Sequence, residues 1–209
     1  MGFLSKIFGK EKKQDDIIKE IYESLFCDDF AIYKKMENIY PDIFSSNPDM
    51  GVLAKIATDN KIESRIRVLA YRKLTTLHIV PHNRDILGVI FEYHMPQGLD
   101  TLAVYADGSA RYINYSGKLL FWEGVSPSYD VTNIFKEAEI IAAKIGPWKE
   151  KRLPPPPKGN IRLSFLVNGE IYFGQGPSDA MYNEPLLQNI IKHLTIFMNY
   201  LVDKAVEKN

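Results

Sequence analysis

The segment Tyr105–Gly124, YADGSARYINYSGKLLFWEG, carries the pattern that decides the fold of this protein. Two short reversals interrupt it, at Asp107-Gly108 and at Ser116-Gly117. Glycine tolerates the positive φ that tight hairpin turns need, so each pair indicates a turn between two strands. With the apolar stretch just before it, the segment predicts three consecutive strands near residues 101–106, 109–115 and 118–123.

The flanking sequence extends this meander. ILGVIFEYHM predicts a strand at 86–94, because it is rich in β-branched and aromatic residues. Further on, NIRLSFLVNGEIYFGQGP alternates apolar and polar residues on both sides of Asn168-Gly169, the strongest short hairpin signal. Short hairpin connections predict a mainly antiparallel sheet of six strands.

Helical periods surround the strands. The segment 130–146 has a helical stripe, an expected N-cap at Asp130 and a Gly146-Pro147 ending, and 187–205 has a longer stripe. Before the sheet, apolar residues recur at helical spacing in about four stretches, near 15–26, 29–39, 52–57 and 62–77. We expect an α+β fold: an N-terminal helical region, then the sheet, with two helices packed on one sheet face.

Three units follow from these patterns. Residues 1–13 form a basic amphipathic segment, residues 14–80 a helical region, and residues 84–209 an antiparallel sheet domain with two helices. In the first unit Phe3, Leu4, Ile7 and Phe8 recur at helical spacing beside Lys6, a pattern typical of segments that lie on an anionic membrane. We expect weak membrane contact there. A frayed tail, or a helix packed on its own domain, is the alternative.

The composition describes a protein that can fold around a sizeable core and has no net charge. Of 209 residues, 45% are hydrophobic and 12% aromatic, which excludes global disorder. Lysine plus arginine number 26, as do aspartate plus glutamate. Because no overall field attracts a polyanion, we expect no nucleic-acid partner.

Cysteine usage and hydropathy indicate the compartment. The single cysteine, Cys27, permits no internal disulfide and favours a reducing cytoplasm. No apolar run approaches the roughly 18 residues that a spanning helix needs. We expect a cytoplasmic protein, with attachment to the inner membrane as an open alternative.

The motifs of common catalytic and cofactor sites are missing. Gly117-Lys118 lacks the phosphate-loop pattern, because Tyr112 and Leu119 stand where a glycine and a Ser or Thr are needed. The sequence contains no nucleophile elbow, and we assign no catalytic, cofactor-binding or metal-binding residue. Catalytic groups can converge from distant positions, so an enzyme of unrecognised type stays open.

Two groups of residues are candidates for binding a partner. Trp148, Lys149 and Arg152 precede a run of four prolines, and Trp and Arg are enriched at protein interfaces. A rigid crossover between helix and hairpin is the alternative for this segment. Tyr112 and Asn114 share one face of their strand, which is either a solvent face or a docking surface.

The segments LDTLAVYADGSARYINYSGKLLFWEG, IGPW, IRLSFL and YFGQGP, with the proline run between the second and third, resemble an uncharacterised family of bacterial cytoplasmic proteins. The likeness covers about residues 84–177. That family has no established activity, so the resemblance implies a bacterial setting and transfers no site residues. At the level of fold, the protein is also similar to profilin and roadblock-type modules, which bind proteins, although its strand count departs from theirs.

These observations lead to an expected function. We expect a non-enzymatic protein-binding or scaffold module whose partner is another protein. One alternative is an enzyme with a pocket between the helical region and the sheet. Another is an immunity or chaperone-like protein that binds one cognate partner.

Overall fold

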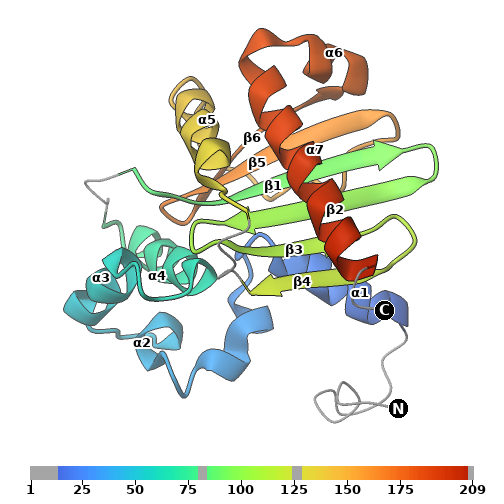
Figure 1. Cartoon of the computed structure of the whole chain (residues 1–209). Coiled ribbons are helices and arrows are strands. Elements are labelled where there is room, and N and C mark those ends of the chain that lie inside the picture. The colour runs from blue at the N-terminus through green and yellow to red at the C-terminus, as the bar shows by residue number, and fades with distance from the viewer. Residues whose placement is uncertain (1–13, 80–83, 124–128, 207–209) are drawn as a thin grey trace.

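The computed structural model of the protein describes residues 14–79, 84–123 and 129–206. Its centre is a six-stranded sheet with the strand order β4-β3-β2-β1-β5-β6, in which all neighbours are antiparallel (Figure 1). The strands are β1 (Ile86–Met95), β2 (Gly98–Tyr105), β3 (Ser109–Ile113), β4 (Leu119–Glu123), β5 (Asn160–Val167) and β6 (Glu170–Pro177). The predicted α+β class and antiparallel sheet are confirmed.

Helices precede, interrupt and follow the sheet. The N-terminal ones are α1 (Gln14–Ser24), the 3-10 helix η2 (Phe30–Met36), α2 (Pro41–Phe44), α3 (Met50–Thr58) and α4 (Ser64–Thr76). The later ones are α5 (Thr132–Ala142), α6 (Ser178–Asn183) and α7 (Pro185–Val206). Periodicity did not predict α2 and α6, because four and six residues are too few to show a helical stripe.

Local chemistry accounts for several boundaries. The N-cap of α5 is Val131 and not the predicted Asp130, but the side chain of Asp130 still accepts a hydrogen bond of 2.8 Å from the backbone of Thr132, the first residue of the helix. This helix ends at Ala142, a few residues before Gly146-Pro147. In the β5–β6 turn, Asn168 and Gly169 both have positive φ, of 46° and 77°, as the Asn-Gly pair predicts.

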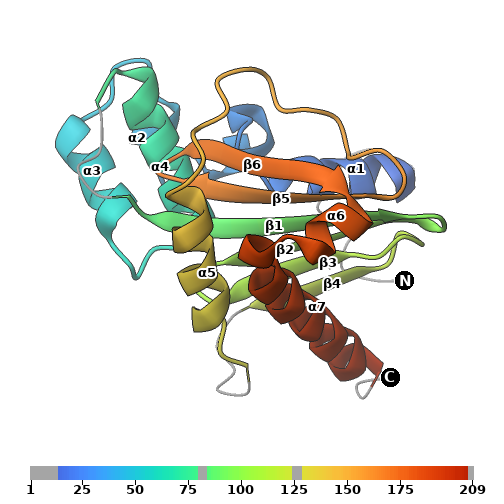
Figure 2. The same ribbon diagram turned by 90° about the horizontal axis from the view of Figure 1, so that it is seen from above.

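The two faces of the sheet are covered by different helices. α5, α6 and α7 lie on one side and the N-terminal helices on the other (Figure 2). On the α7 side, sheet residues such as Phe91 and Phe165 share a hydrophobic cluster with Phe197. On the other side, Tyr105 and Leu166 of the sheet share a cluster with residues of the N-terminal region that include Leu25, Phe26, Leu53 and Leu69. The helical region therefore packs directly on the sheet, opposite the two long later helices.

A capping contact fastens the helical region to the opening meander. Ser64, the first residue of α4, donates its backbone N–H to Asp107 Oδ2 at 2.7 Å. The backbone N–H of Asp107 in turn donates to Ser64 Oγ at 3.0 Å. The β2–β3 turn thus supplies the N-terminal cap that α4 lacks in its own sequence. Within the described residues, no helix has both the length and the apolarity that crossing a bilayer requires.

Candidate functional site

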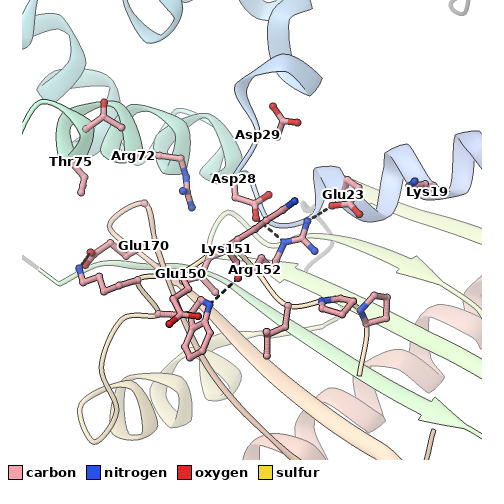
Figure 3. Close-up of a pocket in the computed structure, with 18 residues that line it drawn as sticks. Lys19, Glu23, Asp28, Asp29, Arg72, Thr75, Glu150, Lys151, Arg152 and Glu170 are labelled. Atoms are coloured by element: carbon pink, nitrogen blue, oxygen red, sulfur yellow. Dashed lines mark hydrogen bonds and ion pairs between the residues drawn. The ribbon is translucent and has the colours of Figure 1, made fainter. Parts of the chain in front are cut away.

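A cleft of about 1050 Å³ lies between the N-terminal helices and the sheet. Its walls come from α1 and residues 28–29, from α4, from the proline segment (residues 148–155) and from the β5–β6 turn (Figure 3). We call this space the main cleft. It contains three of the predicted site residues, Trp148, Lys149 and Arg152, on a single wall.

Arg152 connects the proline segment to the opposite wall. Its Nε donates to Asp28 Oδ2 at 2.7 Å, and its terminal nitrogen pairs with Glu23 at the end of α1 (Figure 3). The guanidinium also stacks over the Phe26 ring, 3.9 Å from the centroid. Burial lowers the pKa of Arg152, but the two carboxylates more than offset this and raise it. Arg152 is consequently a fixed cation that ties the two walls together.

Trp148 is packed against the sheet edge. Its backbone N–H donates to the carbonyl of Ile171 at 2.7 Å, and its indole Nε1–H donates to the carbonyl of Lys151 at 3.1 Å. The half-buried ring meets Phe173 edge to face, with centroids 5.1 Å apart. Neighbouring Lys149 is exposed and pairs with Glu170. The wall of the cleft is therefore pre-formed by main-chain and aromatic contacts.

Arg162, on β5, binds the proline segment to the sheet. Only 2% of this residue is exposed, and its guanidinium donates to the carbonyls of Leu153 at 3.3 Å and Pro154 at 2.5 Å. It also donates twice to Gln175 on β6, at 2.9 and 2.6 Å. Prolines have no backbone N–H to donate to a neighbouring strand. The sheet can therefore form hydrogen bonds only with the backbone carbonyls of these residues.

The same arginine contacts a buried carboxylate that reaches α1. Glu92 on β1 is fully buried; Arg162 Nη1 lies 3.6 Å from its Oε2, and its Oε1 accepts a 2.7 Å hydrogen bond from the Tyr22 hydroxyl. Burial raises the pKa of Glu92, and Arg162 and Tyr22 oppose that shift only in part. Through Glu92 and Arg162, the positions of α1 and of the proline segment depend on one buried network.

Arg72 enters the main cleft from α4. The β5–β6 turn sits directly on the helix at this point: a Cβ built on Gly169 would lie 2.3 Å from the backbone N of Arg72. In Figure 3 the Arg72 guanidinium points away from α4 into the cleft, toward the side that carries Asp28 and Lys151. Its Nε is buried without a hydrogen-bond partner.

The remaining predicted residues lie elsewhere. Tyr112 is buried in the cluster under α5 and α7, and its hydroxyl donates to Asp100 Oδ2 at 2.9 Å. Asn114 donates to the Tyr112 hydroxyl at 3.3 Å and lines a second cleft of about 620 Å³, which residues of α1 such as Ile18 also line. Neither residue lines the main cleft, although Pro155 at the end of the proline segment lines the second cleft together with Asn114. The membrane-contact candidates Phe3, Leu4, Lys6, Ile7 and Phe8 lie outside the described residues.

The chemistry of the main cleft is that of ion pairing and apolar contact. Its lining contains five cationic and five anionic side chains: Lys19, Arg72, Lys149, Lys151 and Arg152 against Glu23, Asp28, Asp29, Glu150 and Glu170. Trp148, Leu153 and two prolines add apolar surface. Across residues 14–79, 84–123 and 129–206, no group of three or more His, Cys, Asp or Glu residues could hold a metal ion.

Comparison with protein-family models, curated proteins and solved structures gave no match. Sequence reasoning missed Arg72, Glu92 and Arg162. A signal existed for Glu92 and Arg162, because each is a charged residue inside a strand that is mostly apolar on both faces. Arg72 has no comparable signal, since basic residues on helices are usually solvated.

Proposed function

We propose that this protein is a non-enzymatic protein-binding module and that the main cleft receives a segment of another protein. The observation that carries the proposal is the cleft itself: about 1050 Å³, open, and lined by pre-paired charges beside Trp148 and a fixed run of prolines. Small-molecule pockets commonly span about 300–1,000 Å³. The main cleft lies just above this range, and its volume suits a short peptide segment.

The organisation of the walls favours recognition. Arg152 is held by two carboxylates and an aromatic ring, and Trp148 by two hydrogen bonds. Binding loses less conformational entropy when such anchors are already fixed. Tryptophan and arginine are also among the residues that contribute most of the binding energy at protein interfaces.

The charge balance of the cleft favours a protein over a nucleic acid. Equal numbers of cationic and anionic side chains line it. Nucleic-acid sites neutralise several phosphates with an excess of Lys and Arg. A peptide segment with charges of both signs complements a mixed lining better.

The proposal includes a bacterial, cytoplasmic setting. Its support is the resemblance over residues 84–177 and the single cysteine, which is buried and unpaired. Membrane contact through residues 1–13 stays a separate prediction. Comparing liposome flotation of the full protein and of a variant without those residues tests it, and equal flotation of the two would contradict it.

Site-specific photo-crosslinking in the source cells tests the binding proposal. A photo-crosslinking amino acid replaces Thr76, which is exposed on the rim of the main cleft, or Ile140, which is 50% exposed on α5 across the sheet. We expect the position at 76 to label one contiguous segment of a partner and the position at 140 not to label it. A synthetic peptide of that segment must then bind the purified protein. Identical labelling at both positions, or a peptide that does not bind, would refute the proposal.

A further inference from the structure

We propose that Arg72 is a carboxylate anchor of the main cleft, the group that takes a negatively charged end or side chain of the bound segment. This inference rests on the proposed function and names the chemistry that the partner brings. It follows from the charge arrangement around one side chain.

The Arg72 guanidinium is the unsatisfied group of the cleft. Within the described part of the protein it forms no hydrogen bond or ion pair, and its Nε is buried. A buried donor without a partner is unfavourable, and native structures rarely keep one that no ligand or water satisfies. Burial also lowers the pKa of Arg72, and the nearby acids oppose that shift only in part.

The acids closest to Arg72 already have other partners. Asp28 and Glu170 are the two carboxylates that favour its charged form. Asp28 accepts a 2.7 Å hydrogen bond from Arg152, and Glu170 pairs with Lys149. Each acid is thus held by a different cation, and Arg72 is left with a charge that the fold itself does not pair.

The backbone of Arg72 cannot move away from the cleft. The β5–β6 turn lies so close to α4 that a Cβ on Gly169 would come within 2.6 Å of the Arg72 Cα. The adjacent Tyr71 is buried, and its hydroxyl donates to Asp85 at 2.9 Å. The helix is therefore clamped at this point, and the guanidinium is presented to the cleft from a rigid base.

A single carboxylate is the ligand that fits this arrangement. Guanidinium offers a planar pair of donors that matches a carboxylate in two parallel hydrogen bonds. A phosphate would bring up to two negative charges close to Asp28 and Glu170, which line the same space. The carboxylate can come from an Asp or Glu residue or from the C-terminus of a polypeptide, and the experiment separates these sources.

Nuclear magnetic resonance of arginine side chains tests the anchor directly. The protein is labelled with ¹⁵N-arginine, and the Nε–H signal of Arg72 is assigned by its loss in Arg72→Lys. The probes are N-acetylglutamic acid α-amide for a side-chain carboxylate, N-acetylglycine for a C-terminus, inorganic phosphate, and sodium chloride at matched ionic strength. Arg162, whose Nε donates to Gln175 in the buried network, is the internal reference.

We expect the Arg72 signal to shift saturably with a carboxylate while the Arg162 signal does not move. The carboxylate that binds more tightly identifies the source. A shift no larger than that with chloride, an equal shift of Arg162, or tighter binding of phosphate than of either carboxylate would overturn the inference.

Affinity for the crosslinked partner peptide gives a second measurement. Arg72→Gln should weaken binding of that peptide roughly 10-fold or more, as loss of a charge-assisted hydrogen bond does. Specific crosslinking with unchanged affinity in Arg72→Gln would refute the anchor and leave the proposed function standing. Saturable carboxylate binding without specific crosslinking would refute the proposed function and leave the anion site standing.

Discussion

Gly169→Ala should separate the two roles of the glycine in the β5–β6 turn. Gly169 has a φ of +77°, which L-residues rarely adopt, and it also lies against the backbone of α4. Gly159 has nearly the same φ, +78°, but a Cβ there would meet nothing within 4 Å. Gly159→Ala is therefore a matched control that has the backbone strain without the collision.

The expected magnitudes follow from these two geometries. The left-handed conformation costs an alanine about 1–2 kcal/mol at either position. At Gly169 the new methyl group would also lie 2.3 Å from the backbone N of Arg72, and forcing a group into packed space costs about 1–3 kcal/mol more. We expect Gly169→Ala to lose about 2–5 kcal/mol in total, a large part of the roughly 5–15 kcal/mol that holds a domain together.

Urea unfolding of the two variants and the parent protein measures the difference. With a slope of about 3 kcal/mol per molar urea, a loss of about 3 kcal/mol lowers the midpoint by about 1 M. Gly159→Ala should lower it by about 0.3–0.7 M, against about 0.7–1.7 M for Gly169→Ala. If the two variants unfold at the same urea concentration, the β5–β6 turn does not pack tightly against α4, and it does not hold the backbone of Arg72 in place.

Three further predictions concern the charged and buried groups. Arg152→Met should destabilise the protein by about 1–3 kcal/mol in urea unfolding, because two half-buried carboxylates lose their partner. Lys149→Met breaks a largely exposed ion pair and should cost under about 1 kcal/mol in the same measurement. The pKa of Glu92 is raised in the folded state, so the native protein binds the extra proton and stability falls as pH rises above the unfolded pKa through the folded one. Glu92→Gln lacks this loss, so its stability relative to the parent should improve as the pH rises above the ordinary pKa of a glutamate, 4.5. A constant or opposite trend would contradict the inference that burial raises the pKa of Glu92. Tyr112→Phe should lose about 1 kcal/mol in thermal or urea unfolding, because buried Asp100 loses a 2.9 Å hydrogen bond, and an unchanged midpoint would show that this bond is not needed.

The buried residues Glu92 and Arg162 set the positions of two walls of the main cleft. Glu92 holds α1 through Tyr22, and Arg162 holds the carbonyls of Leu153 and Pro154. Both walls of the cleft thus depend on two adjacent charged residues that pair across β1 and β5. A substitution in this network should therefore change binding in the cleft without touching the bound segment.

Local sequence patterns determined the strands and their turns. Alternation and the Asp-Gly, Ser-Gly and Asn-Gly pairs depend on residues close together in the sequence, and the three turn glycines, Gly108, Gly117 and Gly169, all have the positive φ that was predicted. We predicted one covering layer of helices, whereas the strands β1 and β5 are buried on both faces, as their nearly continuous apolar runs allow.

Tertiary structure alone decided where the charges meet. Arg152 reaches Glu23 and Asp28, more than a hundred positions earlier in the sequence, and no local pattern encodes such a contact. The sequence predicts that Gly169 is needed for the conformation of its own turn. Only the packing of the helical region on the sheet shows that Gly169 also leaves room for α4 to lie against that turn. That packing brings Arg72 into a space where the nearby carboxylates are already paired, because pairing depends on distance in the folded protein and not on position in the sequence.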